Sequence, residues 1–375
     1  MGFRVCQVLH GIVGGGSEQV VLNYCSRMHD IHFDLLYQYE PNPQILERFH
    51  EAGIICIQIP DKVHHPLRHL YAMFQIFRNG HYDVVHSHLD WFMNSYVCFL
   101  AMLAGIKKRI AHHHQAYTNP LQSHSGLRAR ISFVIKNLFC AIMRIPCKLF
   151  ATHWLACGEA AAFNGWGRSA VRNGKVKILP NAIDPERFEF SETVRREVRA
   201  KYGIAEGIFV IGHVGRFFPE KNHKFIIELF SVYSQNRSNC KVLLVGNGPL
   251  QTEIQTMVQE KGLEDKIVFA GLQKDVLEFY CAMDVLVLPS TREAFPMTLV
   301  EAQYNGLSCL VSAAVPKETA ITDNVFPLPI NDVKPWCEKL DLFGVTCNRE
   351  QPLIKSDRFD IRKCYKMLES FYQIP

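Results

Sequence analysis

Short apolar runs alternate with segments of helical periodicity along the whole 375-residue chain. The apolar runs are almost continuous, as is typical of parallel strands that are buried on both faces. Neighbouring parallel strands need crossover connections, and the helical segments between the runs supply them. The alternation therefore predicts an α/β protein built on doubly wound parallel sheets.

The expected strands share branched and aromatic residues, and the expected helices lie between them. The strands are Phe3–Leu9, His32–Tyr39, Ile54–Ile59, Asp83–His86, Arg109–His112, Trp154–Cys157, Phe209–Val214, Lys241–Val245, Ile267–Phe269, Val285–Leu288 and Cys309–Ser312. The helices are Ser17–His29, Pro43–Ala52, Pro66–Arg78, Trp91–Ala104, Leu127–Ala151, Asn222–Gln235, Pro249–Lys261, Lys274–Ala282, Pro296–Asn305 and Asp360–Tyr372.

The length predicts two domains, at roughly 100–200 residues each. A turn-rich segment, LPNAIDPERF, is followed by a polar helical segment, SETVRREVRAKYG, and marks the boundary between them. We expect one Rossmann-like domain over residues 1–183 and a second over 184–358. The last helix, within 359–375, belongs to the second domain or crosses back to the first.

Composition excludes several classes of protein. The formal net charge of +5 does not call for nucleic-acid binding, and it suits an anionic substrate or an anionic membrane surface. Thirteen cysteines without a CxxC pair indicate a reducing cytosol rather than a disulfide framework. No run of 18 apolar residues occurs, and the first strand does not resemble a signal peptide.

Ligands of open α/β sheets bind beyond the carboxyl ends of the strands, so the loops there carry the candidate sites. In the second half, Gly215, Arg216 and Lys221 follow one strand and precede a helix, where N–H groups and the helix dipole already favour anions. The planar fork of arginine and the point charge of lysine suit a diphosphate. Solvated loop cations remain an equally good interpretation of either residue alone.

Two further loops of the second half carry candidate residues. Gly246 and Gly248 follow the next strand and permit close approach of a ligand, although a plain tight turn explains them as well. Glu293 precedes a helix, and Glu301 lies inside it. Two carboxylates eight positions apart can accept hydrogen bonds from different hydroxyls of one polyol ligand. Ordinary surface acids are the alternative.

In the first half, Gly14, Gly15, Gly16 and Glu18 follow the first strand, without the spacing of a dinucleotide or Walker loop. Histidines follow two later strands. An imidazole at a strand end could orient or deprotonate an acceptor hydroxyl, whereas a zinc site lacks an acid or cysteine at a familiar spacing. Strand alternation places His113 opposite its two neighbours. The histidine clusters are His86-Ser87-His88 and His112-His113-His114.

Taken together, these motifs resemble those of glycosyltransferase family 4, which has the GT-B fold of two Rossmann-like domains facing across a cleft. The matching segments are GGGSE, HSH, RIAHHH, ILPNAID, VGRFFPEKN, VGNGP and EAFPMTLVEA. The last contains the two glutamates eight positions apart that are typical of the family. The pattern looks closest to the exopolysaccharide and capsule branches.

The resemblance implies an acceptor-binding first domain, a donor-binding second domain, a retaining transfer of sugar, and no requirement for a metal or other cofactor. Arg216 and Lys221 would hold the donor diphosphate, Glu293 the sugar and Glu301 the ribose, and His114 would be the active-site histidine. Further implied donor contacts are Gly15, Gly16, Gly215, Gly246, Gly248, Leu272, Ala294, Phe295 and Met297. The acceptor-side candidates are Glu18, His86, His88 and His113.

The chain departs from the family pattern at two positions. Ala294 and Pro296 stand where glycines are common, and the proline removes one N–H from the implied phosphate site. Because of these departures, the family pattern does not indicate which sugar the donor carries. The expected donor is a nucleotide-diphospho-sugar, with UDP as the working choice, and the expected acceptor is a glycan or a polyprenyl-linked saccharide. A nucleotide-sugar epimerase or hydrolase and a non-catalytic nucleotide-sugar-binding subunit are the alternatives.

The segment Leu127–Leu149 mixes basic and large apolar residues. Basic amphipathic helices lie on anionic bilayers, so this segment predicts peripheral attachment to the inner face of the cell membrane. A helix packed in the core with a solvated basic face explains the same pattern equally well.

Overall fold

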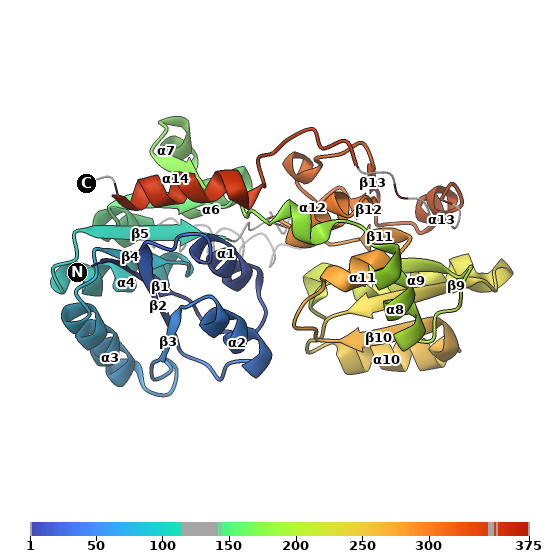
Figure 1. Cartoon of the computed structure of the whole chain (residues 1–375), viewed down its shortest axis with the longest axis horizontal. Coiled ribbons are helices and arrows are strands. Elements are labelled where there is room, and N and C mark those ends of the chain that lie inside the picture. The colour runs from blue at the N-terminus through green and yellow to red at the C-terminus, as the bar shows by residue number, and fades with distance from the viewer. Residues whose placement is uncertain are drawn as a thin grey trace, which may run out of the picture. The chain divides into compact units, whose positions relative to one another are not determined.

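The computed structural model describes residues 2–114, 142, 144–293, 295–343, 349 and 352–373. The chain divides into two compact units. The first contains residues 1–183 and 358–375, and the second contains residues 184–357. The C-terminal helix therefore belongs to the N-terminal unit, and the return begins at Arg358, one residue before the expected position. Figure 1 shows the elements of each unit.

The N-terminal unit is built on a seven-stranded parallel sheet with the order β3-β2-β1-β4-β5-β6-β7. This order, which reverses direction at β1, is that of a doubly wound sheet. The strands are β1 Phe3–Val8, β2 Ile31–Tyr37, β3 Ile55–Gln58, β4 Val84–Ser87, β5 Lys108–His113, β6 His153–Ala156 and β7 Val176–Ile178.

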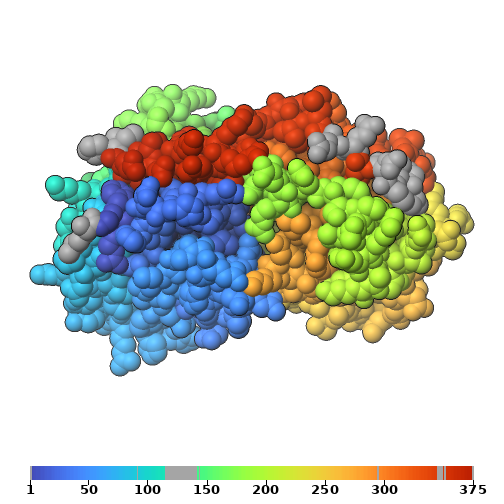
Figure 2. Space-filling model, in the orientation of Figure 1, coloured from blue at the N-terminus to red at the C-terminus, as the bar shows by residue number. Residues whose placement is uncertain are grey.

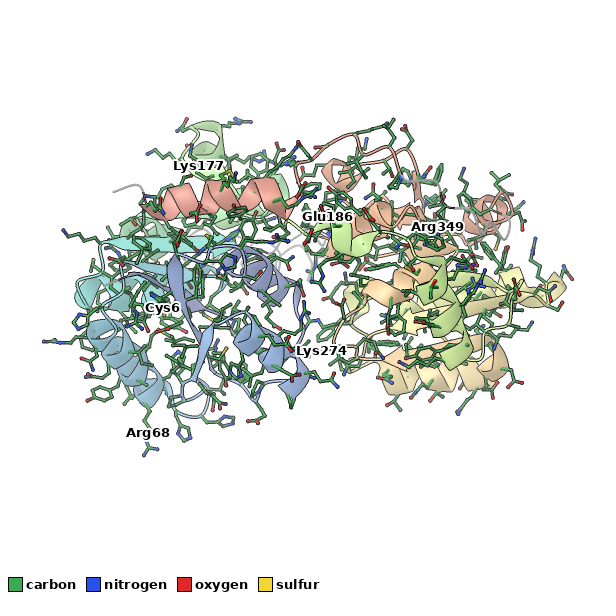
Figure 3. The ribbon with its side chains drawn as sticks, viewed as in Figure 1. Cys6, Arg68, Lys177, Glu186, Lys274 and Arg349 are labelled. Atoms are coloured by element: carbon green, nitrogen blue, oxygen red, sulfur yellow. The ribbon has the colours of Figure 1, made fainter. Side chains whose placement is uncertain are left out.

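Helices flank this sheet and bury its apolar side chains. They are α1 Gly16–Cys25, α2 Pro43–Glu51, α3 Pro66–Asn79, α4 Trp91–Leu103, α6 Glu159–Trp166, α7 Arg168–Arg172 and α14 Ile361–Gln373. Local chemistry sets several helix ends: Asn42 caps α2 by accepting from two backbone N–H groups, and Pro43 occupies the first turn, where it costs no hydrogen bond. Figure 3 shows Cys6 of β1 inside this unit, whereas Arg68 of α3 points away from it.

The C-terminal helix is joined to the N-terminal unit by a parallel bridge between Ile183 and Asp360. The backbone N–H of Ile183 donates to Phe359 O at 2.9 Å, and that of Ile361 donates to Ile183 O at 2.8 Å. Helix α14 then packs one apolar face against α1, and its atoms (red) lie against the first residues of the chain (blue) in Figure 2. Its opposite face remains polar, as expected for a helix at a surface.

The second unit has a six-stranded parallel sheet with the order β10-β9-β8-β11-β12-β13. Its strands are β8 Phe209–Val214, β9 Cys240–Val245, β10 Ile267–Gly271, β11 Val285–Leu288, β12 Ser308–Ser312 and β13 Val325–Leu328. Its α-helices are α8 Glu192–Lys201, α9 His223–Tyr233, α10 Gln251–Glu260, α11 Leu277–Ala282, α12 Met297–Tyr304 and α13 Lys334–Leu340, with short 3₁₀ turns between elements.

The two doubly wound parallel sheets confirm the fold class expected from the sequence. The structure adds two edge strands, β7 and β13, and the helices α6, α7 and α13. Strand β7 has only three residues, and β13 contains Pro327, which is tolerated at a sheet edge but weakens the sequence signal. Of the expected helix Leu127–Ala151, residues 127–141 and 143 lie outside the described residues, while 144–150 are helical. No helix within the described ranges is long and apolar enough to cross a bilayer.

Candidate functional site

A polar loop joins the end of β8 to helix α9 in the C-terminal unit. It carries Arg216 and a 3₁₀ turn, Pro219–Lys221, and it ends at Asn222, which adopts a left-handed conformation with φ of 57°. The side chain of Asn222 donates to Pro289 O at 3.2 Å, which ties this loop to the end of β11. Lys221 is thereby directed towards the loop that follows β11.

Lys221 meets Glu293 at this point. Lys221 Nζ donates to Glu293 Oε1 at 2.6 Å, and Ser290 Oγ donates to the same oxygen at 2.7 Å. The side chains of Lys221 and Glu293 are only 20% and 8% exposed. Charge-assisted hydrogen bonds of this kind are short and hold both partners in one geometry. The structure therefore brings together two residues that the sequence placed 72 positions apart and assigned to different parts of a donor.

Arg216, the other predicted cation, is held differently. It is exposed, and its guanidinium carbon lies 4.6 Å from the centroid of the Phe218 ring. Stacking on an aromatic face restricts an arginine while leaving its N–H groups directed outward. The loop thus presents one largely buried, paired cation and one exposed cation.

The glycines of the neighbouring loop allow two backbones to touch. A Cβ at Gly246 would lie 2.2 Å from Gly215 O, and a Cβ at Gly248 would lie 2.8 Å from the backbone N and O of Phe217. Both glycines have positive φ, of 131° and 155°. The loop after β9 is therefore packed directly on the loop after β8. Contact of these glycines, and of Gly215, with a donor stays a prediction.

Glu301 lies in the second turn of α12 and is buried. The Tyr280 hydroxyl donates to Glu301 Oε2 at 2.6 Å. Burial, reinforced by the neighbouring carboxylate, raises the pKa of Tyr280 well above its usual value, so the tyrosine keeps its proton and acts as the donor. Pro296 is the N-cap of α12 rather than its first helical residue, which corrects the expected start by one position.

The remaining predicted donor contacts of the C-terminal unit lie at the same sheet edge or outside the described residues. Phe295 and Met297 are buried at the start of α12, and Leu272 directly follows β10. Gly271, at the end of β10, accepts a hydrogen bond at 2.8 Å from the backbone N–H of Gly246. Ala294 lies outside the described residues.

In the N-terminal unit, Glu18 holds the glycine-rich loop after β1. Its Oε2 accepts hydrogen bonds from the backbone N–H groups of Val13, Gly14 and Gly15 at 2.9, 2.6 and 2.9 Å. A carboxylate in the first turn of a helix is also stabilised by the helix dipole. Glu18 was predicted as an acceptor-side residue, and in the structure its carboxylate fixes the conformation of this loop. A Cβ at Gly16 would meet no heavy atom within 4 Å.

Histidines in and directly after β4 and β5 form a buried network on one face of the sheet. His88 Nδ1 lies 2.9 Å from His114 Nε2, and His88 Nε2 lies 2.8 Å from Gln7 Oε1. His86 Nδ1 lies 2.7 Å from the Tyr372 hydroxyl, which also accepts from Gln7 Nε2 at 2.9 Å. Helix α14 thus contributes one end of the network, and His114 forms the other.

Burial keeps these imidazoles neutral. It lowers the pKa of His86 to about 3 and that of His114 to about 4, and it lowers the pKa of His88 and His112 well below the usual value. His113 points to the other side of β5, as alternation predicts, and packs edge-on against Trp166 with ring centroids 4.9 Å apart. Its pKa falls to about 3 by burial.

Three of the histidines lie close enough together to be considered as metal ligands. Ligand nitrogens of His86, His88 and His112 lie within 4.8 Å of one another. The rings stack, however, with the His86 and His88 centroids 4.1 Å apart, and both nitrogens of His88 already have partners. The adjoining cavity is about 10 Å³, room for about one water molecule. Hydrogen bonds at His86 Nδ1 and at both nitrogens of His88 fit a neutral network better than a metal centre, whereas His112 is held by ring stacking and neither of its nitrogens has a hydrogen-bond partner among the described residues. Independence from divalent metals stays a prediction.

Comparison with known proteins decides the family. A model described as Glycosyltransferase Family 4 matches residues 14–187, and one described as Glycosyl transferases group 1 matches residues 194–343. The putative glycosyltransferase EpsF of Bacillus subtilis is 31% identical over 317 residues, covering 83% of this chain and 79% of EpsF. The chain belongs to glycosyltransferase family 4.

Solved structures extend this family assignment to the fold. Anabaena HepE in complex with UDP and glucose aligns over 100% of both chains with a TM-score of 0.78 and 17% identity. WaaG, a glycosyltransferase involved in lipopolysaccharide biosynthesis, covers 99% of this chain and 95% of its own, with a TM-score of 0.65 and 17% identity. These neighbours show that this family 4 glycosyltransferase has the GT-B fold.

Sequence reasoning missed four polar residues of this glycosyltransferase: Ser290 and Tyr280 beside the two glutamates, and Gln7 and Tyr372 in the histidine network. Gln7 carried a signal, since it is a polar residue inside an otherwise buried strand, where a partner is required. Tyr372 carried none, because its contacts lie 286 and 365 positions away in the chain.

Proposed function

We propose that the chain is a retaining glycosyltransferase that moves a sugar from a UDP-sugar to a glycan or lipid-linked saccharide acceptor in surface polysaccharide synthesis. The observation that carries the proposal is the largely buried Lys221–Glu293 pair between the loops that follow β8 and β11. It places a fixed cation where ligands of open α/β sheets bind.

The choice of UDP and of a surface polysaccharide rests on the relatives. HepE is described in complex with UDP-glucose. An Escherichia coli relative, 30% identical over 142 residues that cover 37% of this chain and 36% of its own, is named UDP-Gal:alpha-D-GlcNAc-diphosphoundecaprenol alpha-1,3-galactosyltransferase. Its acceptor is a lipid-linked saccharide, which supports the same class of acceptor for this chain.

The reaction breaks the bond between the anomeric carbon and the diphosphate oxygen, so negative charge develops on the leaving diphosphate. Lys221 has three N–H donors, and its bond to Glu293 uses one of them, which leaves donors for a phosphate oxygen. Arg216 adds the exposed guanidinium of the same loop. Cations fixed in advance need no reorganisation during the reaction, and this is usually the largest catalytic contribution.

The two carboxylates suit the hydroxyl groups of the donor. Glu293 is proposed to accept from the transferred sugar, and Glu301 from the ribose. An ionised carboxylate has about four acceptor positions, of which the Tyr280 hydroxyl occupies one at Glu301. His114 is proposed as the active-site histidine contributed by the N-terminal unit, with Gly15 and Gly16 bordering the substrates.

The experiment measures release of nucleoside diphosphate from a panel of UDP-, GDP- and ADP-sugars, with and without a membrane extract that supplies acceptor. We expect acceptor-dependent release from a UDP-sugar, and retention of anomeric configuration in the product by NMR. Lys221→Ala should lower turnover by about 10²–10³. The matched control is Lys224→Ala, since Lys224 pairs with Glu253 at the surface.

Near wild-type turnover of Lys221→Ala would contradict the assigned role of this lysine. Isomer formation without acceptor would instead indicate an epimerase, and inverted product would contradict the retaining mechanism. Release from GDP- or ADP-sugars alone would overturn the choice of UDP while leaving the transferase reaction intact.

We also propose contact with an anionic membrane surface. Residues 144–150 are helical and expose Ile145 (66%) and Leu149 (70%), one turn apart, next to Lys148. Apolar side chains flanked by lysine are suited to the interface of an anionic bilayer. Wild-type protein should co-float with vesicles containing about 30% anionic lipid, and the Ile145→Glu/Leu149→Glu variant should not. Equal flotation of both proteins would contradict the contact.

A further inference from the structure

We propose that helix α14 positions His114 through a directional chain of hydrogen bonds that runs from His114 through His88 and Gln7 to Tyr372. The chain holds His114 in the tautomer that carries its proton on Nε2 and its lone pair on Nδ1. Tyr372 and Gln7 are positioning residues in this proposal, which rests on the proposed role of His114 as the active-site histidine.

Gln7 sets the direction of the chain because its amide has distinct donor and acceptor ends. Its Nε2 donates to the Tyr372 hydroxyl at 2.9 Å, and the same nitrogen lies 3.6 Å from Cys25 Sγ. Its Oε1 must accept, so the ring nitrogen 2.8 Å away, His88 Nε2, carries a proton. The amide therefore imposes one tautomer on His88.

The tautomer of His88 imposes that of His114. A neutral imidazole has one N–H, so His88 Nδ1 bears a lone pair once Nε2 is protonated. His88 Nδ1 then accepts from His114 Nε2 at 2.9 Å. His114 Nδ1 is left with its lone pair; the atom is buried in this structure and has no hydrogen-bond partner among the described residues. This is the atom that can accept a proton or hydrogen bond from a substrate hydroxyl.

The sheet aligns the residues of this hydrogen-bonded chain, and burial keeps their imidazoles neutral. Gln7 of β1 lies opposite His86 of β4 in the parallel register, and side chains two positions apart share a face, so His88 and His114 follow on that same face. Burial holds the pKa of His88 and His114 below the usual range, with that of His114 at about 4. A charged imidazole, which donates at both nitrogens, would break the direction of the chain.

Tyr372 closes the chain from the C-terminal helix. Its hydroxyl is shared between Gln7 Nε2 and His86 Nδ1, and its side chain is 1% exposed. Because it accepts from Gln7, its own proton is directed to His86 Nδ1. Without this hydroxyl, the only acceptor left for Gln7 Nε2 among the described residues is Cys25 Sγ, which is a weak one. The amide can then rotate. Rotation would present N–H to His88 and reverse the tautomers of both histidines.

The primary experiment compares wild type with Tyr372→Phe, which removes one oxygen and keeps the ring. Long-range ¹H–¹⁵N NMR of histidine-labelled protein reports the tautomer of each imidazole, with the His114 signals assigned from His114→Asn. We expect an Nε2–H tautomer for His114 in wild type and a mixture in Tyr372→Phe. Gln7→Met, which removes the amide, should give the same mixture. The matched control is Tyr365→Phe, a tyrosine of the same helix that is outside the chain.

Kinetics provide the second measurement. In the acceptor-dependent assay, Tyr372→Phe should lower kcat about tenfold with little change in KM for the nucleotide sugar, while Tyr365→Phe keeps both values. An Nδ1–H tautomer of His114 in wild type, or an unchanged tautomer and kcat in Tyr372→Phe, would overturn the proposal. If no nucleotide sugar supports release by the wild type, the proposed function fails, whereas the NMR result still decides the hydrogen-bonded chain.

Discussion

The polar side chains of the two candidate sites are stabilised in different ways in the two units. The C-terminal unit uses charges that neutralise one another: Lys221 with Glu293, and Asp284 between two arginines. The N-terminal unit uses neutral imidazoles linked to the amide of Gln7 and the hydroxyl of Tyr372. Both arrangements are largely buried, and both lie on parallel sheets of similar topology.

This difference separates two kinds of chemistry. Paired charges can meet an anion and redistribute their hydrogen bonds, which suits a leaving diphosphate. Neutral hydrogen bonds define the position of single protons, which suits orientation of a hydroxyl. The same contrast predicts that the units respond differently to pH and to removal of charge.

The largest expected effect is acid unfolding of the N-terminal unit before the C-terminal unit. A histidine whose folded pKa lies below about 6.5 contributes full stability above that pH and loses it as pH falls towards the folded pKa, because the unfolded chain binds more protons. Each contributes up to about 1.4 kcal/mol per pH unit. Five buried histidines of the N-terminal unit behave in this way: His86, His88, His112 and His114 on one face of the sheet, and His113 on the other.

Among the described histidines of the C-terminal unit, His213 and His223 have lowered pKa values, of about 4 and 2. Fluorine NMR of 5-fluorotryptophan protein distinguishes the units, since Trp166 is buried in the first and Trp336 in the second. Between pH 6.5 and 4, the Trp166 signal should report unfolding first. Repeating the titration at high salt screens surface charges and should preserve the order. Simultaneous loss, or earlier loss of the Trp336 signal, would contradict the contrast.

The next effect is smaller and falls on the other unit. Asp284 accepts from Arg195 at 2.5 Å and from Arg199 at 2.7 Å, and all three side chains are buried. Asp284→Asn leaves two buried guanidinium groups without a counter-charge, which should lower the free energy of unfolding by about 3–5 kcal/mol. Urea unfolding followed at Trp336 measures this loss. Asp341→Asn, which breaks the exposed pair with Arg237, should cost at most about 1 kcal/mol.

How much of this contrast can be predicted from the sequence depends on how far apart the contacting residues lie along the chain. Strands and helices followed from periodicity, because burial of a continuous apolar run is a local pattern. Lys221, Glu293, Glu301 and His114 were identified as candidates because parallel topology brings loops at strand ends to one sheet edge. The family resemblance assigned their roles, which stay predictions.

The partners of these residues could not be predicted. The pairing of Lys221 with Glu293 spans 72 positions, and the contact of Gln7 with Tyr372 spans 365. Neither spacing leaves a periodic signal in the sequence. Glu18 illustrates the converse, since its three backbone contacts lie within five positions and a helix-capping role was readable from the local pattern. The family resemblance suggested an acceptor contact instead.

The smallest expected effect tests how the charged pair is supported. Ser290 Oγ donates to Glu293 Oε1, the same oxygen that accepts from Lys221 Nζ. Ser290→Ala removes one donor but leaves the ion pair, so kcat/KM for the nucleotide sugar should fall about tenfold, equivalent to about 1.4 kcal/mol. Ser238→Ala, at an exposed serine, should change nothing.

Combining Ser290→Ala with Lys221→Ala shows whether the serine acts through the pair. Two donors to one oxygen are coupled, so the double variant should be less impaired than the product of the single effects by a factor of several. If Ser290 acts only by positioning Glu293 against Lys221, then Ser290→Ala should lower kcat/KM little further in the Lys221→Ala background. Fully multiplicative effects would mean that Ser290 contributes independently of the ion pair. The C-terminal site would then depend on a neutral hydrogen bond, as the network of the N-terminal unit does, and the contrast between the units would be weaker.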